Sequence, residues 1–275
     1  MPDPAAHVSA KAATKTRLAI CLRTSGVVDC AALHPHPAMP SPTPIAVPPR
    51  VHRIIVFGGT FDPPHIQHTS GLLGHADGLL GSDGMVLYVP AARSPFKMDG
   101  PVATDRDRVD LLRLSLGSDE RAQIWTDELD RAAATPGSPS FMIDTLKRLR
   151  EMIDVGGRGG EIKLRLLIGT DQAIAIHRWR EYREVMRLAE PMVWLRSPVA
   201  DAPSLTLALT QSGVWSDEEL AQWRDRIAPL PLLDLSATQI RERLKATPDA
   251  LNDAFLRKAL PIRVLEAIAA RGLYR

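Results

Sequence analysis

Short apolar runs alternate with amphipathic segments from Arg53 onward, and this alternation constrains the fold more than any other feature of the chain. Each run is apolar almost throughout, which is typical of strands covered on both faces of a parallel sheet. The sequence therefore predicts an α/β fold, a Rossmann-like parallel sheet with helices on both faces. The predicted strands are residues 54–57, 85–89, 122–126, 164–168, 192–195 and 230–235, and the predicted helices are 66–80, 105–116, 141–152, 173–188, 217–226, 237–245 and 262–270.

The first 50 residues differ from the rest of the chain. They hold nine of the 23 prolines and show no periodicity long enough to bury a face. Residues 1–50 are therefore predicted to be a proline-rich, disordered extension, and residues 51–275 one folded domain. Both cysteines, Cys21 and Cys30, precede this domain, which suits a protein of the reducing cytoplasm.

The composition excludes several classes of protein. With 45% hydrophobic and 24% charged residues, the chain has the make-up of an ordinary globular protein. Its apolar stretches reach only about eight residues, far below the ~20 that span a bilayer, so no membrane association is expected. Residues 51–275 carry 29 basic and 30 acidic side chains, so no broad basic surface for nucleic acid is expected either.

A sheet of this kind binds ligands beyond the carboxyl ends of its strands, so the segments that follow the strands are the candidate site. The segment after the first strand contains Gly58 and Gly59, which allow a tight turn and close approach of a phosphate or ribose. His65 and His68 would share one face of a helix that begins there. His75 falls on the same face, so a zinc site is the alternative to a nucleotide site here. No cysteine or carboxylate accompanies the three histidines, however.

A second candidate lies after the last predicted strand. Ser236, followed three residues later by Gln239, forms a capping box, so a helix should begin there with free backbone N–H groups. That helix end would accept an anion, with the Thr238 hydroxyl and the Arg241 guanidinium beside it. An ordinary capped surface helix is the alternative for this segment considered alone.

Several motifs together carry a family resemblance. The run at residues 58–68, Gly-Gly-Thr-Phe-Asp-Pro-Pro-His-Ile-Gln-His, resembles the signature of the HxGH nucleotidyltransferases, and among them that of bacterial nicotinate-nucleotide adenylyltransferases. Further matches follow in order over the stretch from about residue 53 to residue 275. They lie at residues 89–91 with Lys97, at 139–141 and 143–146, and at 168–171, 177–180, 235–241 and 272–274.

The resemblance implies a nucleotidylyl-transferase type of fold and an activity in NAD biosynthesis, the pyridine nucleotide pathway. Such enzymes join the adenylyl group of ATP to nicotinate mononucleotide, and they release pyrophosphate and deamido-NAD. The acceptor phosphate is already anionic, so no serine–histidine–acid set is needed, and none is recognised in the sequence. Mg²⁺ is expected to be bound mainly through the ATP phosphates rather than by protein ligands. A homo-oligomer is compatible with the sequence.

The resemblance also implies residue roles. His65 and His68 would be the catalytic pair, with His68 nearer the α-phosphate. ATP would be bound by Gly58, Gly59, Thr60, Phe61, Lys97, Asp171, Ser236, Thr238 and Arg241. The nicotinate substrate would be bound by Phe141, Met142, Thr170, Trp179 and Arg180.

Four positions depart from the family pattern. Gln67 replaces the glycine between the two histidines, Met142 a threonine, Phe96 a histidine and Ala237 a serine. Of these, Gln67 matters most, because its side chain must point away from the nucleotide or the pocket must widen. The alternatives are a sibling enzyme for nicotinamide mononucleotide, phosphopantetheine or a polyol phosphate, and a catalytically weakened relative that only binds nucleotides. The preference for the acid or the amide substrate is left open.

An insertion at residues 196–229 has a helix-like run of its own and two tryptophans, Trp215 and Trp223. Two interpretations are open for it. It packs over the edge of the sheet, or it mediates self-association.

Overall fold

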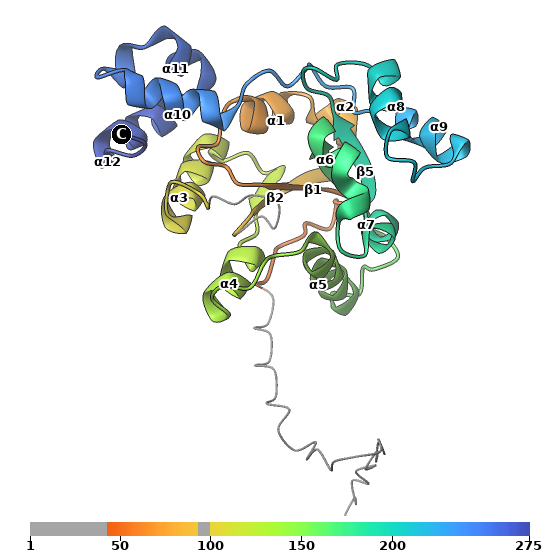
Figure 1. Cartoon of the computed structure of the whole chain (residues 1–275). Coiled ribbons are helices and arrows are strands. Elements are labelled where there is room, and N and C mark those ends of the chain that lie inside the picture. Colours follow the sequence, from red (N-terminus) through yellow and green to blue (C-terminus); the bar gives the residue numbers. More distant parts are fainter. Residues whose placement is uncertain (1–42, 93–99) are drawn as a thin grey trace, which may run out of the picture. The chain divides into compact units, whose positions relative to one another are not determined.

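The computed structural model describes residues 43–92 and 100–275, and Figure 1 shows how their helices and strands are arranged. The strands are β1 (Arg53–Gly59), β2 (Gly84–Pro90), β3 (Ala122–Ile124), β4 (Lys163–Gly169) and β5 (Glu190–Trp194). They form one parallel sheet in the order β3-β2-β1-β4-β5. This confirms the predicted α/β class and the five runs from which these strands are built.

The sixth predicted strand is wrong. Residues 230–235 are extended but join the sheet only through a single bridge between Leu233 and Arg196. Pro229 and Pro231 lack the backbone N–H that a ladder needs, so this run cannot pair continuously with β5. It serves instead as the connection that leads to the next helix.

The helices fall close to the predicted segments. The first predicted helix is divided into a π-helix and two short helices, and the helix predicted at 173–188 is divided into three pieces. The bounds are η2 (Gln67–Gly71), α1 (Leu72–Gly74), α2 (Ala76–Leu80), α3 (Asp105–Leu116), α4 (Asp127–Ala134), α5 (Met142–Val155), α6 (Thr170–Ala175), η3 (Ile176–Arg178), α7 (Tyr182–Leu188), α8 (Ala202–Thr210), α9 (Asp217–Asp225), α10 (Ala237–Ala246), η4 (Ala250–Asn252), α11 (Ala254–Ala259) and α12 (Ile262–Arg271).

Alternate residues of β1 enter different hydrophobic cores, as the two-residue period of a strand requires. Ile54 and Val56 pack in the core that includes α5 and α7, whereas Ile55 and Phe57 pack in the core that includes α1, α2 and α3. Helices therefore cover both faces of the sheet (Figure 1).

Two groups of helices extend the domain (Figure 1). Helices α10, α11 and α12 form a third core against α3. At the β5 edge, the insertion folds as α8 and α9, and its Trp215 and Trp223 rings pack edge to face with centroids 5.3 Å apart. Both tryptophans belong to the core beneath the sheet, so the insertion packs over the sheet edge, the first of the two interpretations.

The domain begins before the predicted boundary at residue 51. The Trp125 Nε1 donates to the Thr43 carbonyl oxygen at 2.8 Å, and Arg158 donates to the carbonyl oxygens of Pro48 and Pro49 at 2.9 and 3.0 Å. Residues 43–50 thus lie against the sheet domain. The carbonyl oxygens of this proline-rich segment remain available as hydrogen-bond acceptors. The prediction of disorder for residues 1–42 lies outside the described residues.

Candidate active site

A cleft of about 1400 Å³ opens at the carboxyl ends of β1 and β4. Residues from both halves of the domain line it, as the position of the strand ends predicts. The sequence-predicted site residues that line it are Gly58, Gly59, Thr60, Phe61, His65, His68, Phe141, Met142, Asp171, Trp179, Arg180, Ser236, Thr238 and Arg241. The structure therefore brings together residues as far apart in the chain as Gly58 and Arg241, although it leaves their individual roles as predictions.

Two predicted residues are not among them. Thr170 is buried, and its hydroxyl accepts from the Arg196 backbone N–H at 3.0 Å and lies 3.4 Å from the Trp194 carbonyl oxygen. The hydroxyl joins the end of β4 to the end of β5, so the prediction that Thr170 contacts the nicotinate substrate is not supported by its placement. Lys97 and the neighbouring Phe96 lie outside the described residues.

The two histidines stack on each other at the mouth of β1. Their ring centroids are 3.6 Å apart with an interplanar angle of 26°, and the edges of Phe57 and Phe61 pack around His68. His65 is only 1% exposed, and among the described residues the buried Nδ1 atoms of both rings have no hydrogen-bond partner. Unpaired buried nitrogens in a cleft are expected where a ligand completes the hydrogen bonding.

Both rings are neutral at neutral pH. Burial lowers the pKa of His65 to about 4, with a smaller lowering from the Arg196 charge and an opposing effect from Asp234. Burial also lowers the pKa of His68 well below its usual value, and His65 and Arg196 act in the same direction. Each neutral ring carries one N–H, so the pair can donate hydrogen bonds to phosphate without adding charge.

The loop between β1 and the histidines is held from behind. The buried Asp62 carboxylate accepts from the Val102 backbone N–H at 2.6 Å and from the Tyr274 hydroxyl at 2.8 Å. Burial, together with the nearby Asp62 charge, raises the pKa of Tyr274, so its hydroxyl stays protonated and donating. The fully buried Arg108 donates to the Thr60 carbonyl oxygen at 2.5 Å. The motif at residues 272–274 thus contributes a support for the loop.

The predicted capping box is confirmed at the start of α10. Ser236 Oγ accepts from the Gln239 backbone N–H, and Gln239 Oε1 accepts from the Ser236 N–H, both at 3.2 Å. Arg241 donates to the Asp62 carbonyl oxygen at 2.6 Å and to Thr238 Oγ1 at 3.2 Å. Arg241 therefore links the α10 end of the cleft directly to the β1 loop.

A different group of residues lines the opposite part of the cleft. The Arg180 guanidinium lies 5.1 Å from the centroid of the Phe141 ring, and the half-buried Trp179 precedes Arg180. Met142 lies against Gly58 so closely that a Cβ built on the glycine would be 2.9 Å from the Met142 Cε. An aromatic and cationic surface with an apolar floor suits a flat, acidic ring.

Five charged residues of the cleft are not among the predicted site residues, namely Asp62, Glu128, Arg178, Arg196 and Lys245. Arg196 follows β5 and lies 3.9 Å from the Asp171 carboxylate, so the rule about strand ends would have found it had the connection after β5 been treated as a ligand segment. Glu128 lies in α4, a helix that was not predicted. Burial raises the pKa of Glu128, and its carboxylate accepts from the Thr145 hydroxyl at 2.9 Å.

Gln67, the departure from the motif that matters most for nucleotide binding, does not line the cleft. Its Oε1 accepts from the Leu235 N–H at 2.9 Å, and its Nε2 lies 3.3 Å from the Leu232 carbonyl oxygen. The side chain therefore points away from the expected nucleotide position.

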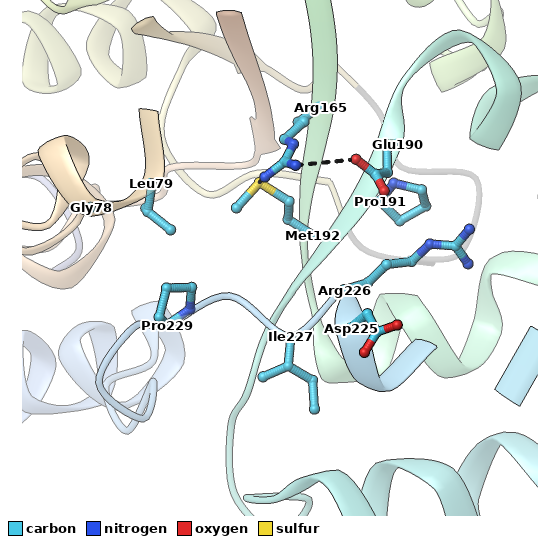
Figure 2. Close-up of a pocket in the computed structure, with 10 residues that line it drawn as sticks. All are labelled: Gly78, Leu79, Arg165, Glu190, Pro191, Met192, Asp225, Arg226, Ile227 and Pro229. Atoms are coloured by element: carbon cyan, nitrogen blue, oxygen red, sulfur yellow. Dashed lines mark hydrogen bonds and ion pairs between the residues drawn. The ribbon is translucent and has the colours of Figure 1, made fainter. Parts of the chain in front are cut away.

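Figure 2 shows a second, smaller cavity of about 220 Å³ near the opposite ends of β4 and β5. Arg165 pairs with Glu190 at 3.4 Å, and its Nη1 lies 3.8 Å from the Met192 sulfur. Arg226 and Asp225 add one charge of each sign to the lining. Its charged groups balance one another, and it lies away from the carboxyl ends of the strands, so the larger cleft is the candidate active site.

The zinc alternative gains no support. Across residues 43–92 and 100–275 no group of three or more histidine, cysteine or acidic side chains is placed to hold a metal ion. His75 is exposed, and its Nδ1 lies 2.8 Å from the Gly71 carbonyl oxygen. In the same described part of the chain, no helix combines the length and apolar character needed to cross a membrane.

A parallel α/β sheet with histidine donors and a capped helix at its ligand edge is the architecture of a nucleotide-binding protein. The cytidylyltransferase-like family model matches residues 56–243, and the chain belongs to this family. The match contains the loop after β1, both histidines and most of α10.

The more specific similarity is to the nicotinate-nucleotide adenylyltransferases, as the motifs indicated. The chain is 33% identical over 230 residues to a protein of Chromobacterium violaceum named "probable nicotinate-nucleotide adenylyltransferase", which covers 81% of this chain and 99% of that protein. A protein of the same name from Stenotrophomonas maltophilia is 34% identical over 228 residues, covering 80% and 96%. The resemblance read from the sequence is thereby confirmed.

A solved structure shares the fold. The nicotinic acid mononucleotide adenylyltransferase of Plasmodium falciparum, complexed with APC, matches with a TM-score of 0.52 over 81% of this chain and 97% of that one. The same protein complexed with NaAD matches equally well. At 15% sequence identity this likeness concerns the fold.

Proposed function

We propose that the protein is an adenylyltransferase that joins the adenylyl group of ATP to nicotinate mononucleotide in NAD biosynthesis. The products are deamido-NAD and pyrophosphate. The observation that carries the proposal is the stacked pair of uncharged histidines with unpaired nitrogens, facing the capped end of α10 across one cleft. The names of the relatives that are about one-third identical support the choice of substrate.

The reaction needs positioning and charge stabilisation rather than a protein nucleophile. A phosphate oxygen of nicotinate mononucleotide forms a bond to the α-phosphorus of ATP. The bond from that phosphorus to the bridging oxygen of the β-phosphate breaks, and pyrophosphate leaves with the electron pair. Negative charge spreads over the transferring group, so fixed N–H donors at this position lower the barrier.

The chain supplies these donors from two sides. His68 donates to the α-phosphate and His65 to a neighbouring phosphate oxygen, which matches the depressed pKa values that keep both rings neutral. The N-terminus of α10, with Thr238 and Arg241, receives the leaving phosphates. The cleft offers several hydrogen-bond donors to the phosphates, so they are held in position before the reaction begins.

Mg²⁺ enters as part of the Mg–ATP substrate. The described acidic side chains of the cleft are already engaged: Asp62 by backbone and hydroxyl donors, Glu128 by Thr145, and Asp171 by Arg196. They do not converge into a cage, which fits an ion that is held by phosphate oxygens and water.

The acceptor occupies the other part of the cleft. Trp179 provides a face for the pyridine ring, and the Arg180 and Phe141 pair borders it. The enzyme acts in the cytoplasm in this proposal, with ATP and nicotinate mononucleotide as its partners.

One assay tests the proposal. The full chain is incubated with Mg–ATP and, in separate reactions, nicotinate mononucleotide, nicotinamide mononucleotide, phosphopantetheine and a polyol phosphate, and released pyrophosphate is measured. Release at the highest kcat/KM with nicotinate mononucleotide is the expected result. Release only with another acceptor would select a sibling enzyme, and ATP binding without any release would select a nucleotide-binding relative.

A further inference from the structure

Gln67 joins the histidine turn to the segment that precedes α10. Both polar atoms of its side-chain amide form hydrogen bonds. Oε1 accepts from the Leu235 N–H at 2.9 Å, and Nε2 donates to the Asp234 carboxylate at 2.5 Å. The Leu232 carbonyl oxygen, 3.3 Å from Nε2, is a third partner. The partners are more than 160 residues away in sequence, so one side chain fastens together two distant parts of the cleft.

The segment that Gln67 holds has few other hydrogen bonds of its own. Besides Gln67, residues 230–235 are held at Leu233, whose N–H donates to the Leu195 carbonyl oxygen at 2.9 Å, and at Pro231, whose carbonyl oxygen accepts from the Trp194 Nε1 of β5 at 2.7 Å. Leu235 comes immediately before the cap residue Ser236, so its N–H is held one residue before the cap of α10. Anchoring Leu235 therefore fixes where the N-terminus of α10 points.

On the other side, Gln67 is the first residue of the π-helix that carries His68. In this wide turn the Gly71 N–H donates to the Ile66 carbonyl oxygen at 2.7 Å. The Gln67 backbone is thus fixed in the same turn as the catalytic histidines, while its side chain reaches the approach to α10. A glycine at position 67 would have no group to make this connection.

We infer that Gln67 is a positioning residue that sets the His65–His68 pair and the N-terminus of α10 at the spacing required by the ATP phosphates. The inference rests on the proposed function and deepens it. The residue that departs from the motif then supports ATP binding in this chain instead of weakening it. It acts through Leu235 and Asp234 and does not touch the substrate.

The hydrogen bond between Gln67 and the Asp234 carboxylate can be tested by substituting first one residue and then both. In the Gln67→Glu variant two carboxylates would meet, which removes the Nε2 donor and places like charges together. Adding Asp234→Asn supplies a new donor to Glu at position 67 and removes the repulsion. The Asp234 charge also acts on His65, so all measurements are made at pH 7.5, where His65 is neutral.

The experiment measures the Mg–ATP dissociation constant by calorimetry and steady-state kcat and KM for each substrate. Gln67→Glu is expected to weaken Mg–ATP binding by roughly tenfold, with KM for nicotinate mononucleotide changed less than about twofold. The double variant Gln67→Glu/Asp234→Asn is expected to recover at least half of the lost affinity on a logarithmic scale. Ser70→Ala, at an exposed position of the same π-helix, is the matched control and should bind like the parent.

Three outcomes would overturn the inference. They are parental ATP affinity in Gln67→Glu, a double variant that binds no better than the single one, and a loss of kcat that follows the folded fraction while KM for ATP is unchanged. The binding measurement needs no acceptor. It therefore tests Gln67 even if the parent fails to turn over nicotinate mononucleotide, a failure that would count against the proposed function alone.

Discussion

The two parts of the cleft are built in different ways. The phosphate part, formed by residues 58–68 and the start of α10, is held by directed hydrogen bonds: Asp62 accepts from Tyr274 and Arg241, and Gln67 accepts from the Leu235 N–H. The acceptor part around Phe141 and Trp179 relies on ring packing and a cation–π contact. The difference follows from the chemistry, because developing charge requires donors in fixed places, whereas a flat ring tolerates small shifts.

The largest effect is expected from removing a donor of the phosphate part. His68→Ala should lower kcat by about 10² to 10³, which corresponds to ~3 kcal/mol of transition-state stabilisation, with little change in KM for nicotinate mononucleotide. Pyrophosphate release under saturating substrates measures it. His75→Ala, which removes an exposed histidine a few residues further on, is the control. Turnover by His68→Ala at the parental rate would remove His68 from the mechanism.

Acid should weaken the phosphate part in the ligand-free protein. The pKa of His65 is about 4 in the folded state and ~6.5 when unfolded, so the unfolded chain binds more protons between these values. The stability that this ring contributes is complete above pH 6.5 and declines as the pH falls toward 4. Between pH 7 and pH 5 the free energy of unfolding should decrease by about 2 kcal/mol from this group.

Urea unfolding at the two pH values measures this decrease, and the His65→Gln variant isolates it from the titration of carboxylates. The difference between parent and variant should shrink as the pH falls. An identical pH dependence in both proteins would show that burial does not depress the pKa of His65.

Truncating the acceptor part should affect binding and spare the chemistry. Trp179→Ala is expected to raise KM for nicotinate mononucleotide by up to about tenfold, the equivalent of a lost stacking contact of roughly 0.5–1.5 kcal/mol. KM for ATP and kcat should remain within about twofold of the parent. Initial-rate measurements with each substrate varied in turn separate these quantities. A fall in kcat equal to that of His68→Ala would erase the distinction between the two parts.

The smallest expected effect concerns the cap of α10. Ser236→Ala removes the acceptor for the Gln239 N–H and should cost about 1 kcal/mol of stability. Thermal unfolding and KM for ATP, which should rise severalfold, are the measurements. Ser216→Ala removes the corresponding cap of α9, outside the cleft, and provides the matched control because it should lower stability without changing KM for ATP.

Much of the fold could be predicted because it depends on local patterns. The run at residues 105–116 coincides with α3, and the capping box at Ser236 marks the first turn of α10 correctly. The run at 230–235 was misread because apolar composition says nothing about whether a proline interrupts the ladder. Glu128 was missed because three of the four buried side chains of α4 are charged, so burial in this helix does not show as an apolar face.

The sequence predicted which residues belong to the candidate site better than it predicted their protonation states and the directions of their side chains. Of the predicted residues that the structure describes, all but Thr170 line the cleft, and the Thr170 hydroxyl bonds the backbone instead. The neutral state of the histidines depends on burial and on Arg196, neither of which is visible in residues 58–68. The direction of the Gln67 side chain depends on a partner 168 residues away.

The bond between Tyr274 and Asp62 has a consequence for how the protein is made. A ribosome synthesises the β1 loop early, yet the hydroxyl that supports Asp62 arrives only 212 residues later. Contacts of such long sequence separation form late, so the sheet can assemble before the loop reaches its final conformation. A nascent chain arrested within α12 would therefore possess the histidines and the other contacts of the loop but not its Tyr274 hydrogen bond, and the loop would be completed only in the last step of folding.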